Sequence, residues 1–252
     1  MFEGFTRRRI ATSGAEINLV VGGDGPPLLL LHGFPQNHVI WHKVAGALAE
    51  RFTVVATDLR GYGDSEKVPT TEDHSSYSKR EMARDQVEVM RILGFERFQV
   101  VGHDRGGRVA HRMAIDHAAR VRRLAVLDIV PTLEHFERTD MAFALGYYHW
   151  FFLAQRHDLP ERMILRDVED WFDLQTSREP KDRSFFHPEA RADYLAALRQ
   201  PGTVAAICED YRAAAGIDAD LLEERAEAPE RVGDDEALDA QPLLDDLEEV
   251  AR

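Results

Sequence analysis

The chain has 252 residues, enough for one large domain or for a core domain with an insertion. Its net charge of −14 at pH 7 argues against a nucleic-acid backbone as partner. The single cysteine, Cys208, excludes an internal disulfide framework and fits a reducing compartment. No stretch approaches the roughly 18 apolar residues of a membrane span, and the charged N-terminal stretch lacks the apolar run of a secretory signal. We therefore expect a cytoplasmic protein without a membrane partner.

Residues 1–130 alternate between strand-like and helix-like patterns, which predicts an α/β core with a mainly parallel sheet. The apolar residues 17–21 and 28–31 flank a turn-like, glycine-rich stretch, and we interpret them as a hairpin. Three further short apolar runs end in small or acidic residues, as expected for buried parallel strands: 53–57, 98–102 and 124–128. Apolar residues at helical spacing follow in two sets: Met82, Val89, Met90 and Leu93, then Val109, Ala110, Met113 and Ala114.

The strand pattern stops at Pro131, and two segments of different composition follow. Aromatic-rich helical patterns fill residues 131–215, which predicts a helical cap inserted over the strand ends. From residue 217 to 252 the chain has 14 acidic and 3 basic residues, a net charge of −11, whereas the rest carries −3. We therefore divide the chain into a core (1–130), a cap (131–215) and an acidic tail (216–252) that forms acidic helices or is partly disordered.

Residues 100–108, VVGHDRGGR, combine a strand, a sharp turn and the start of a helix. The spacing of Gly102, Asp104 and Gly106 fits a nucleophile elbow, in which small flanking residues permit a strained turn that presents the central side chain. Because the central residue is an aspartate, its carboxylate would attack a saturated carbon and form a covalent ester. The alternative is a glycine-rich turn with a solvated aspartate, since isolated glycine motifs have a real false-positive risk.

Two arginines, Arg105 and Arg108, follow this aspartate closely. A guanidinium group beside a nucleophile suits a substrate that carries a carboxylate, which it can hold through two parallel hydrogen bonds. The alternative is that both arginines lie on the exposed first turns of a helix. The pattern favours a substrate that carries a carboxylate.

Two further segments, LLLHGFP at residues 29–35 and DLRGYGDS at 58–65, follow predicted core strands. Together with GHDRGGR at 102–108 they resemble the α/β-hydrolase family and, within it, the branch with an aspartate nucleophile. The arginine-rich elbow is similar to that of the fluoroacetate (haloacetate) dehalogenases, whereas relatives that act on neutral substrates usually have an aromatic residue next to the nucleophile. The resemblance covers about residues 2–215 and implies an α/β-hydrolase core with a helical cap.

This resemblance implies a role for each matching core residue. Asp104 would be the nucleophile of a hydrolytic dehalogenation that converts fluoroacetate to glycolate and halide, and Arg105 and Arg108 would hold the substrate carboxylate. Phe34 would line the pocket, and its backbone N–H and that of Arg105 would stabilise the oxyanion during ester hydrolysis. Asp128, at the end of a predicted strand, would orient a catalytic histidine. The alternative is an aspartate that caps the loop before Pro131.

The cap segment YYHW at 147–150 resembles the halide-binding run of this family. His149, Trp150 and Tyr211 would direct N–H and O–H groups at the departing halide and replace part of its hydration. Core packing is the alternative for Trp150, and a satisfied or exposed histidine is the alternative for His149. His32 is expected to be structural.

The hydrolytic half of the reaction needs a histidine that the resemblance places near the C-terminus, and the chain has no histidine after His187. It also has no strand pattern after Ala215, so the last core strands are expected to be absent. Halide release would then stop after at most one equivalent, with a glycolyl ester trapped on Asp104. A reading-frame slip near Ala215 or a truncated gene would explain the abrupt acidic tail, and translating the source DNA in the other frames would test this.

Two other functions stay open. An epoxide hydrolase shares the HGFP and aspartate-elbow patterns and could polarise an epoxide with Tyr147, Tyr148 or Tyr211, although Arg105 and Arg108 argue against it. A catalytically inactive hydrolase fold fits the missing histidine. The sequence has no zinc-binding spacing, dinucleotide fingerprint or phosphate loop, so no metal or cofactor is expected. The expected partner is a small-molecule haloacid, and members of the family often form homodimers.

Overall fold

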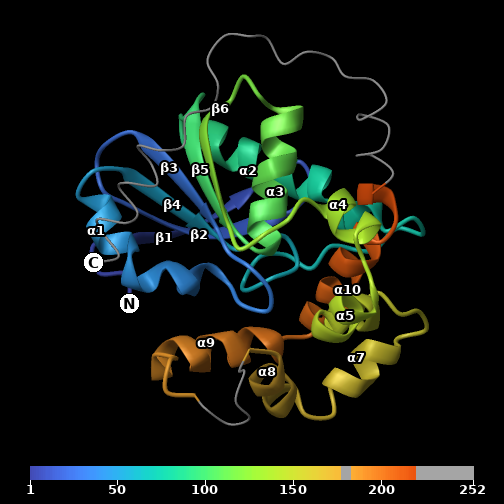
Figure 1. Ribbon diagram of the computed structural model, residues 1–252. Helices are drawn as coiled ribbons and strands as arrows, with labels where there is room; N and C mark the ends of the chain where they lie inside the picture. The colour runs from blue at the N-terminus through green and yellow to red at the C-terminus, as the bar shows by residue number, and fades with distance from the viewer. Residues whose placement is uncertain (177–182, 220–252) are drawn as a thin grey trace.

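The computed structural model describes residues 1–176 and 183–219, with a six-stranded sheet at the centre of this part (Figure 1). The strands are β1 (Thr6–Ala11), β2 (Glu16–Gly22), β3 (Pro27–Leu31), β4 (Thr53–Thr57), β5 (Phe98–His103) and β6 (Val121–Leu127). Their order is β1-β2-β4-β3-β5-β6, in which β4, β3, β5 and β6 run parallel and β1 and β2 add antiparallel pairings. The mainly parallel α/β architecture predicted from the sequence is confirmed.

The predicted hairpin between residues 17–21 and 28–31 is wrong. β2 pairs with β1 and β4, and β3 lies between β4 and β5, so a whole strand separates β2 from β3. The leucines of β3 are fully buried, and a strand with such a run is typically paired on both edges and covered on both faces. The true hairpin joins β1 to β2, where Thr12 Oγ1 accepts hydrogen bonds from the backbone N–H groups of Gly14 and Ala15.

Helices cover both faces of the sheet (Figure 1). The helices of the core are η1 (His38–Lys43), α1 (Ala45–Ala49), η2 (Ser75–Tyr77), α2 (Lys79–Ile92) and α3 (Arg105–Asp116). Leu29 and Leu31 of β3 belong to the apolar cluster that includes side chains of α2 and α3. Leu28 and Leu30 belong to a second cluster, which includes side chains of η1 and α1. Burial on both faces explains why the central strands have continuous apolar sequences.

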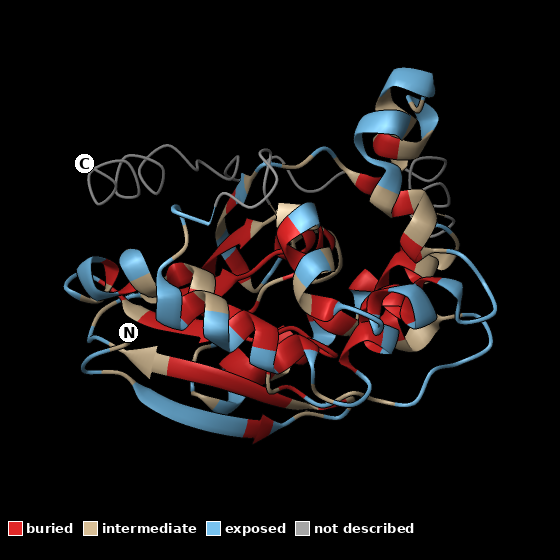
Figure 2. Cartoon of the chain, turned by 90° about the horizontal axis from the view of Figure 1, so that it is seen from below, coloured by how far each residue is buried: buried red, intermediate tan, exposed pale blue. Residues whose placement is uncertain are grey.

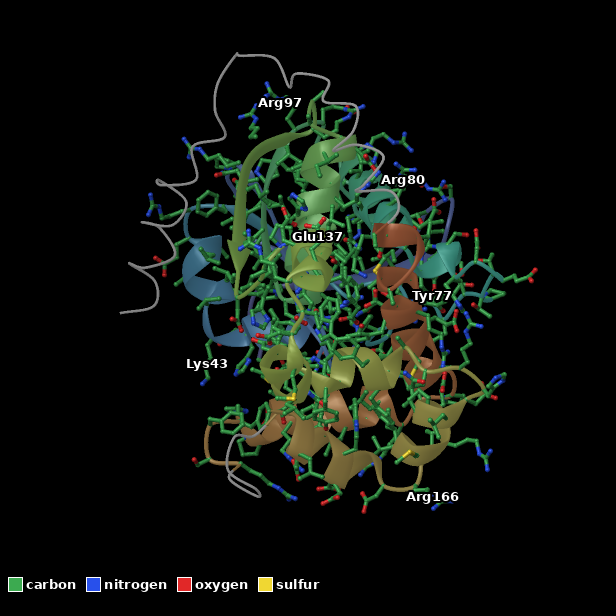
Figure 3. The ribbon with its side chains drawn as sticks, turned by 45° about the vertical axis from the view of Figure 1, so that its right-hand side comes forward. Lys43, Tyr77, Arg80, Arg97, Glu137 and Arg166 are labelled. Atoms are coloured by element: carbon green, nitrogen blue, oxygen red, sulfur yellow. The ribbon has the colours of Figure 1, made fainter. Side chains whose placement is uncertain are left out.

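Residues 131–176 and 183–215 form helices that gather at one end of the sheet (Figure 1). They are α4 (Thr132–Glu137), α5 (Met141–Gly146), α6 (Tyr148–Leu153), α7 (Leu159–Ile164), α8 (Val168–Thr176), α9 (Pro188–Leu198) and α10 (Thr203–Ala214). We call residues 131–215 the cap. Figure 3 labels Arg166 at the outer end of the cap and Arg97 at the opposite end of the molecule. Buried residues concentrate in the sheet and on the helix faces turned toward it (Figure 2).

β6 is one edge of the described sheet, because within the described residues it pairs with β5 alone, and β1 is the other edge. Val126 on this strand and Val130 just after it are 41% and 49% exposed. No strand follows β6 in the described ranges, and most of the acidic tail (220–252) lies outside them. None of the helices in these ranges is long and apolar enough to span a membrane.

Candidate active site

The predicted elbow forms at the junction of β5 and α3. Asp104 occupies it with φ 48° and ψ −114°, a backbone conformation that residues with a side chain rarely adopt. Close backbone contacts explain the glycines around it. A Cβ on Gly102 would lie 2.4 Å from the carbonyl oxygen of Gly106, and one on Gly106 would lie 2.5 Å from that of His32. The turn therefore holds Asp104 in a strained position just beyond the carboxyl end of β5.

The loop after β3 orients the Asp104 carboxylate. The backbone N–H of Phe34 donates a hydrogen bond of 2.8 Å to Asp104 Oδ1. If an ester formed on Asp104, this N–H would lie near the oxygen on which negative charge develops during hydrolysis. The Phe34 ring stacks on His149 with 5.7 Å between the centroids and meets Tyr211 edge-on at 5.1 Å. The loop thus connects the candidate nucleophile with the aromatic residues of the cap.

A cavity of about 690 Å³ lies between the elbow and the cap. Figure 3 labels Lys43, one of its lining residues, on the core side of the boundary between the core and the cap. Six of the predicted site residues line this cavity: Phe34, Asp104, Arg108, Asp128, His149 and Trp150. Arg105 and Tyr211 are buried beside it, next to Trp150.

Arg108 presents part of its guanidinium group without a protein partner. Its Nη1 donates to the carbonyl oxygen of Val130, and its Nη2 lies 3.3 Å from Nδ1 of His135. The guanidinium carbon is 4.4 Å from the centroid of the Trp150 ring, a cation–π arrangement. Arg108 Nε is buried and has no hydrogen-bond partner among the described residues. Burial and the nearby charge of Arg105 lower the pKa of Arg108 to about 10, so it remains a cation at pH 7.

Arg105 is fully buried, and most of its donors are bound by the cap. Its Nε donates to Asp210 Oδ2 at 2.9 Å, and its Nη2 donates to Asp210 Oδ1 at 2.6 Å and to the Asp210 carbonyl oxygen at 2.9 Å. Its Nη1 is buried and has no partner among the described residues. Burial disfavours the charged form, but the Asp210 carboxylate outweighs this and raises the pKa of Arg105. Both arginines are buried, so the alternative of an exposed helical turn is wrong.

The three predicted halide-binding residues come together from α6 and α10. The ring of Tyr211 lies 5.5 Å from that of Trp150 and 6.0 Å from that of His149, measured between centroids. The Tyr211 hydroxyl is buried without a hydrogen-bond partner among the described residues, and burial raises its pKa well above the usual value. Burial also lowers the pKa of His149 to about 4, so this imidazole is neutral at pH 7. The group can therefore offer neutral N–H and O–H donors.

Asp128 lines the cavity in a left-handed conformation with φ 55°, and its side chain has no hydrogen bond to any described residue. Four histidines of the cavity wall were not predicted from the sequence: His42, His103, His135 and His187. His135 stacks on Trp150 with 4.0 Å between the centroids, and its Nε2 is buried without a described partner. The only indication in the sequence for His103 is its position next to the nucleophile.

Within residues 1–176 and 183–219, no group of three or more His, Cys, Asp or Glu side chains could hold a metal ion.

A family model described as the α/β hydrolase fold matches residues 26–185. The chain belongs to the α/β-hydrolase family. Among the relatives of this α/β-hydrolase, a fluoroacetate dehalogenase from Burkholderia sp is 50% identical over 222 residues, which cover 88% of the chain and 73% of that protein. A soluble epoxide hydrolase from Corynebacterium sp. (strain C12) is 37% identical over 209 residues, or 82% of the chain and 71% of that protein.

The fold is also close to that of a solved α/β-hydrolase relative. The crystal structure of ALR0039 from Nostoc sp PCC 7120 superposes with a TM-score of 0.88 at 54% identity, covering 90% of this chain and 78% of that one. These comparisons confirm the predicted membership of the α/β-hydrolase family and the likeness to the haloacetate dehalogenases.

Proposed function

We propose that this α/β-hydrolase cleaves the carbon–halogen bond of a haloacetate, with Asp104 as the nucleophile. The observation that carries the proposal is the pairing, in one cavity, of the Asp104 carboxylate with the Arg108 guanidinium, whose Nε has no described partner. A carboxylate substrate held by Arg108 would bring its α-carbon toward Asp104. The 50% identity to a fluoroacetate dehalogenase supports this assignment.

In the first half of the reaction, an oxygen of Asp104 attacks the α-carbon of the haloacetate. A carbon–oxygen bond forms, the carbon–halogen bond breaks with its electron pair, and halide leaves. Fluoride is a poor leaving group because it is intensely hydrated, so donors must replace that water. His149, Trp150 and Tyr211 are the proposed donors, and the unpartnered hydroxyl of Tyr211 supports this role. The product of this half is a glycolyl ester of Asp104.

In the second half, water attacks the ester carbonyl, and the N–H groups of Phe34 and Arg105 are proposed to stabilise the resulting oxyanion. The attacking water needs a general base, which works best with a pKa near the operating pH. Burial lowers the pKa of His135 and of His149 to about 4, so both are weak bases at pH 7. Three other histidines line the cavity, His42, His103 and His187. No histidine is hydrogen-bonded to Asp128 among the described residues, so none is oriented as a general base. We therefore expect the ester to persist and halide release to stop at about one equivalent per chain.

Epoxide opening is a second candidate, favoured by two observations. Tyr147 lines the cavity and the Tyr211 hydroxyl is unpartnered within the described residues, so both could polarise an epoxide oxygen. A soluble epoxide hydrolase is 37% identical to the chain. The buried cation Arg108 argues against a neutral substrate, because a buried charge without an anion costs free energy.

The proposal is tested by incubating the protein with fluoroacetate, chloroacetate and styrene oxide side by side and measuring released halide and consumed epoxide. We expect up to one equivalent of halide from both haloacetates, and none from Asp104→Asn. This variant is a matched control because the amide oxygen can still accept the Phe34 N–H. Styrene oxide opening without halide release would support the epoxide hydrolase, and a folded protein that reacts with none of the three would be an inactive hydrolase fold. Repeated turnover would refute only the expected stall.

A further inference from the structure

A buried cluster of charges lies behind the cavity wall, around the carboxylate of Asp210 on α10. Asp210 is fully buried and binds three side chains of the core. It accepts hydrogen bonds from Arg105 Nε and Nη2, from Lys79 Nζ and, at 2.7 Å, from the hydroxyl of Tyr62. These donors come from the start of α3, the start of α2 and the loop after β4. A single carboxylate of the cap therefore ties three core segments together, including the nucleophile elbow.

The geometry of the Arg105 contact fixes which donor remains free. Asp210 binds Nε and Nη2 through two nearly parallel hydrogen bonds, and the guanidinium group is planar and rigid. Only Nη1 has no partner among the described residues, although it is buried. The guanidinium carbon also lies 4.2 Å from the ring centroid of Tyr211 and 5.0 Å from that of Trp150. Arg105 is thus held on one edge by an anion and contacted by two aromatic rings, with one nitrogen left without a partner among the described residues.

Asp210 compensates the charges of two buried cations, Arg105 and Lys79. Burying Arg105 and Lys79 without an anion would be strongly unfavourable. Lys79 has a second carboxylate nearby, Asp218, whose Oδ2 lies 3.7 Å from Nζ and whose Oδ1 accepts the Lys79 backbone N–H at 2.8 Å. Within the described residues, Arg105 has an ion pair with Asp210 alone. Loss of the Asp210 charge would therefore release Arg105 from its position.

We propose that Asp210 is the positioning residue for Arg105 and that, through the free Nη1, it sets how tightly the site holds the carboxylate of its substrate. The inference rests on the proposed function, because it concerns the same cavity and the same substrate class. Asp210 itself does not touch the substrate. It directs Nη1 of Arg105, the one nitrogen of that guanidinium group without a partner among the described residues.

The test compares two electrophiles that share the carbon–chlorine bond but differ in charge, chloroacetate and the neutral chloroacetamide. The rate of ester formation on Asp104 is measured by mass spectrometry over a range of concentrations of each. In Asp210→Asn, the half-saturating concentration of chloroacetate is expected to rise roughly 10-fold to 100-fold, as for a lost charge-assisted hydrogen bond. The reaction with chloroacetamide should stay within about 2-fold, because it does not use the guanidinium groups.

The matched control is Glu209→Gln, the neighbouring carboxylate on α10, which pairs with His74 and Arg212 instead of Arg105. It should change neither reaction. If Asp210→Asn is unfolded by circular dichroism, Lys79→Met combined with Asp210→Asn removes one cation together with the anion and is measured in its place. Three outcomes would leave Asp210 without a positioning role. Ester formation slows equally with both electrophiles, it slows with neither, or the combined variant fails to fold.

This result is distinguishable from a failure of the proposed function. If the unmodified chain forms no ester with chloroacetate, the assignment of Asp104 as nucleophile is wrong. If it forms the ester and Asp210→Asn behaves like the unmodified chain toward both electrophiles, the nucleophile stands and the positioning role is wrong.

Discussion

Replacing Arg108 by methionine removes the buried cation of the cavity wall while keeping most of the side-chain volume. In the present structure Nε has no described partner and Nη2 makes only a long contact of 3.3 Å with His135. These two nitrogens lie on one edge of the guanidinium group and could bind both oxygens of a carboxylate. Arg108→Met therefore removes up to two charge-assisted hydrogen bonds to a haloacetate.

Each such bond contributes about 1.5–3 kcal/mol, so the variant should lose about 3–6 kcal/mol of binding to the transition state. At about 1.4 kcal/mol per factor of ten, the second-order rate constant for ester formation with chloroacetate should fall roughly 10²–10⁴-fold. The lower end is expected, because Arg105 Nη1 remains to attract the carboxylate. Arg108→Lys keeps the charge but loses the planar fork, so it should give an intermediate loss.

The assay measures halide release or ester mass with chloroacetate and with chloroacetamide, at pH 7 and constant salt. Chloroacetamide should react with the variant at close to the original rate, since it has no charge to lose. Arg112→Met on the same helix is the matched control, because Arg112 pairs with Asp116 and does not line the cavity. An equal loss for both electrophiles in Arg108→Met would refute a carboxylate-binding role and indicate a collapsed site.

Three further predictions concern the halide donors, the elbow and the pH dependence of stability. Tyr211→Phe should slow ester formation with fluoroacetate about 10-fold or more and with bromoacetate less, because the departure of fluoride depends most on hydrogen-bond donors. Measuring halide release with the two substrates checks this. Gly106→Ala should yield little folded protein by circular dichroism, since its Cβ would lie 2.5 Å from backbone carbonyl oxygens of the neighbouring strand end. Burial lowers the pKa of His32 from 6.5 to about 4. As the pH falls from 6.5 to 4, the unfolded state therefore binds a proton before the folded state does, and the free energy of unfolding should fall by about 3 kcal/mol. His32→Gln, which can keep both hydrogen bonds of the imidazole, should lose less stability than the unmodified chain over this range in urea melts at pH 7 and pH 4.5.

The sequence predicted the central strands well, because their burial on both faces leaves continuous apolar runs. The sequence did not predict the edge strand β1 or the correct pairing of β2. The stretch from Thr6 to Ala11 carries three consecutive arginines and has no clear alternation, so β1 was missed. The turn-like residues before β3 were interpreted as a hairpin, because a local pattern cannot tell that β4 lies between β2 and β3.

For the site, local motifs located the residues that depend on local geometry, such as the elbow around Asp104 and the Phe34 loop. Asp210 was not predicted to have a role, because its partner Arg105 lies 105 positions away in the sequence and their contact exists only in the fold. One indication was present. Asp210 is placed at helical spacing from the apolar residues Ile207 and Ala214, on the buried face of α10, where an unpaired carboxylate would be unfavourable.

The proposed reaction depends on a covalent bond between the carboxylate of Asp104 and the substrate carbon. The most direct measurement is peptide mapping by tandem mass spectrometry after incubation with fluoroacetate, followed by acid quench. We expect a glycolyl ester on Asp104, at up to one per chain, and an unmodified peptide from Asp104→Asn. Fluoride release without any adduct on the peptide that contains Asp104, or an adduct that persists in Asp104→Asn, would contradict it.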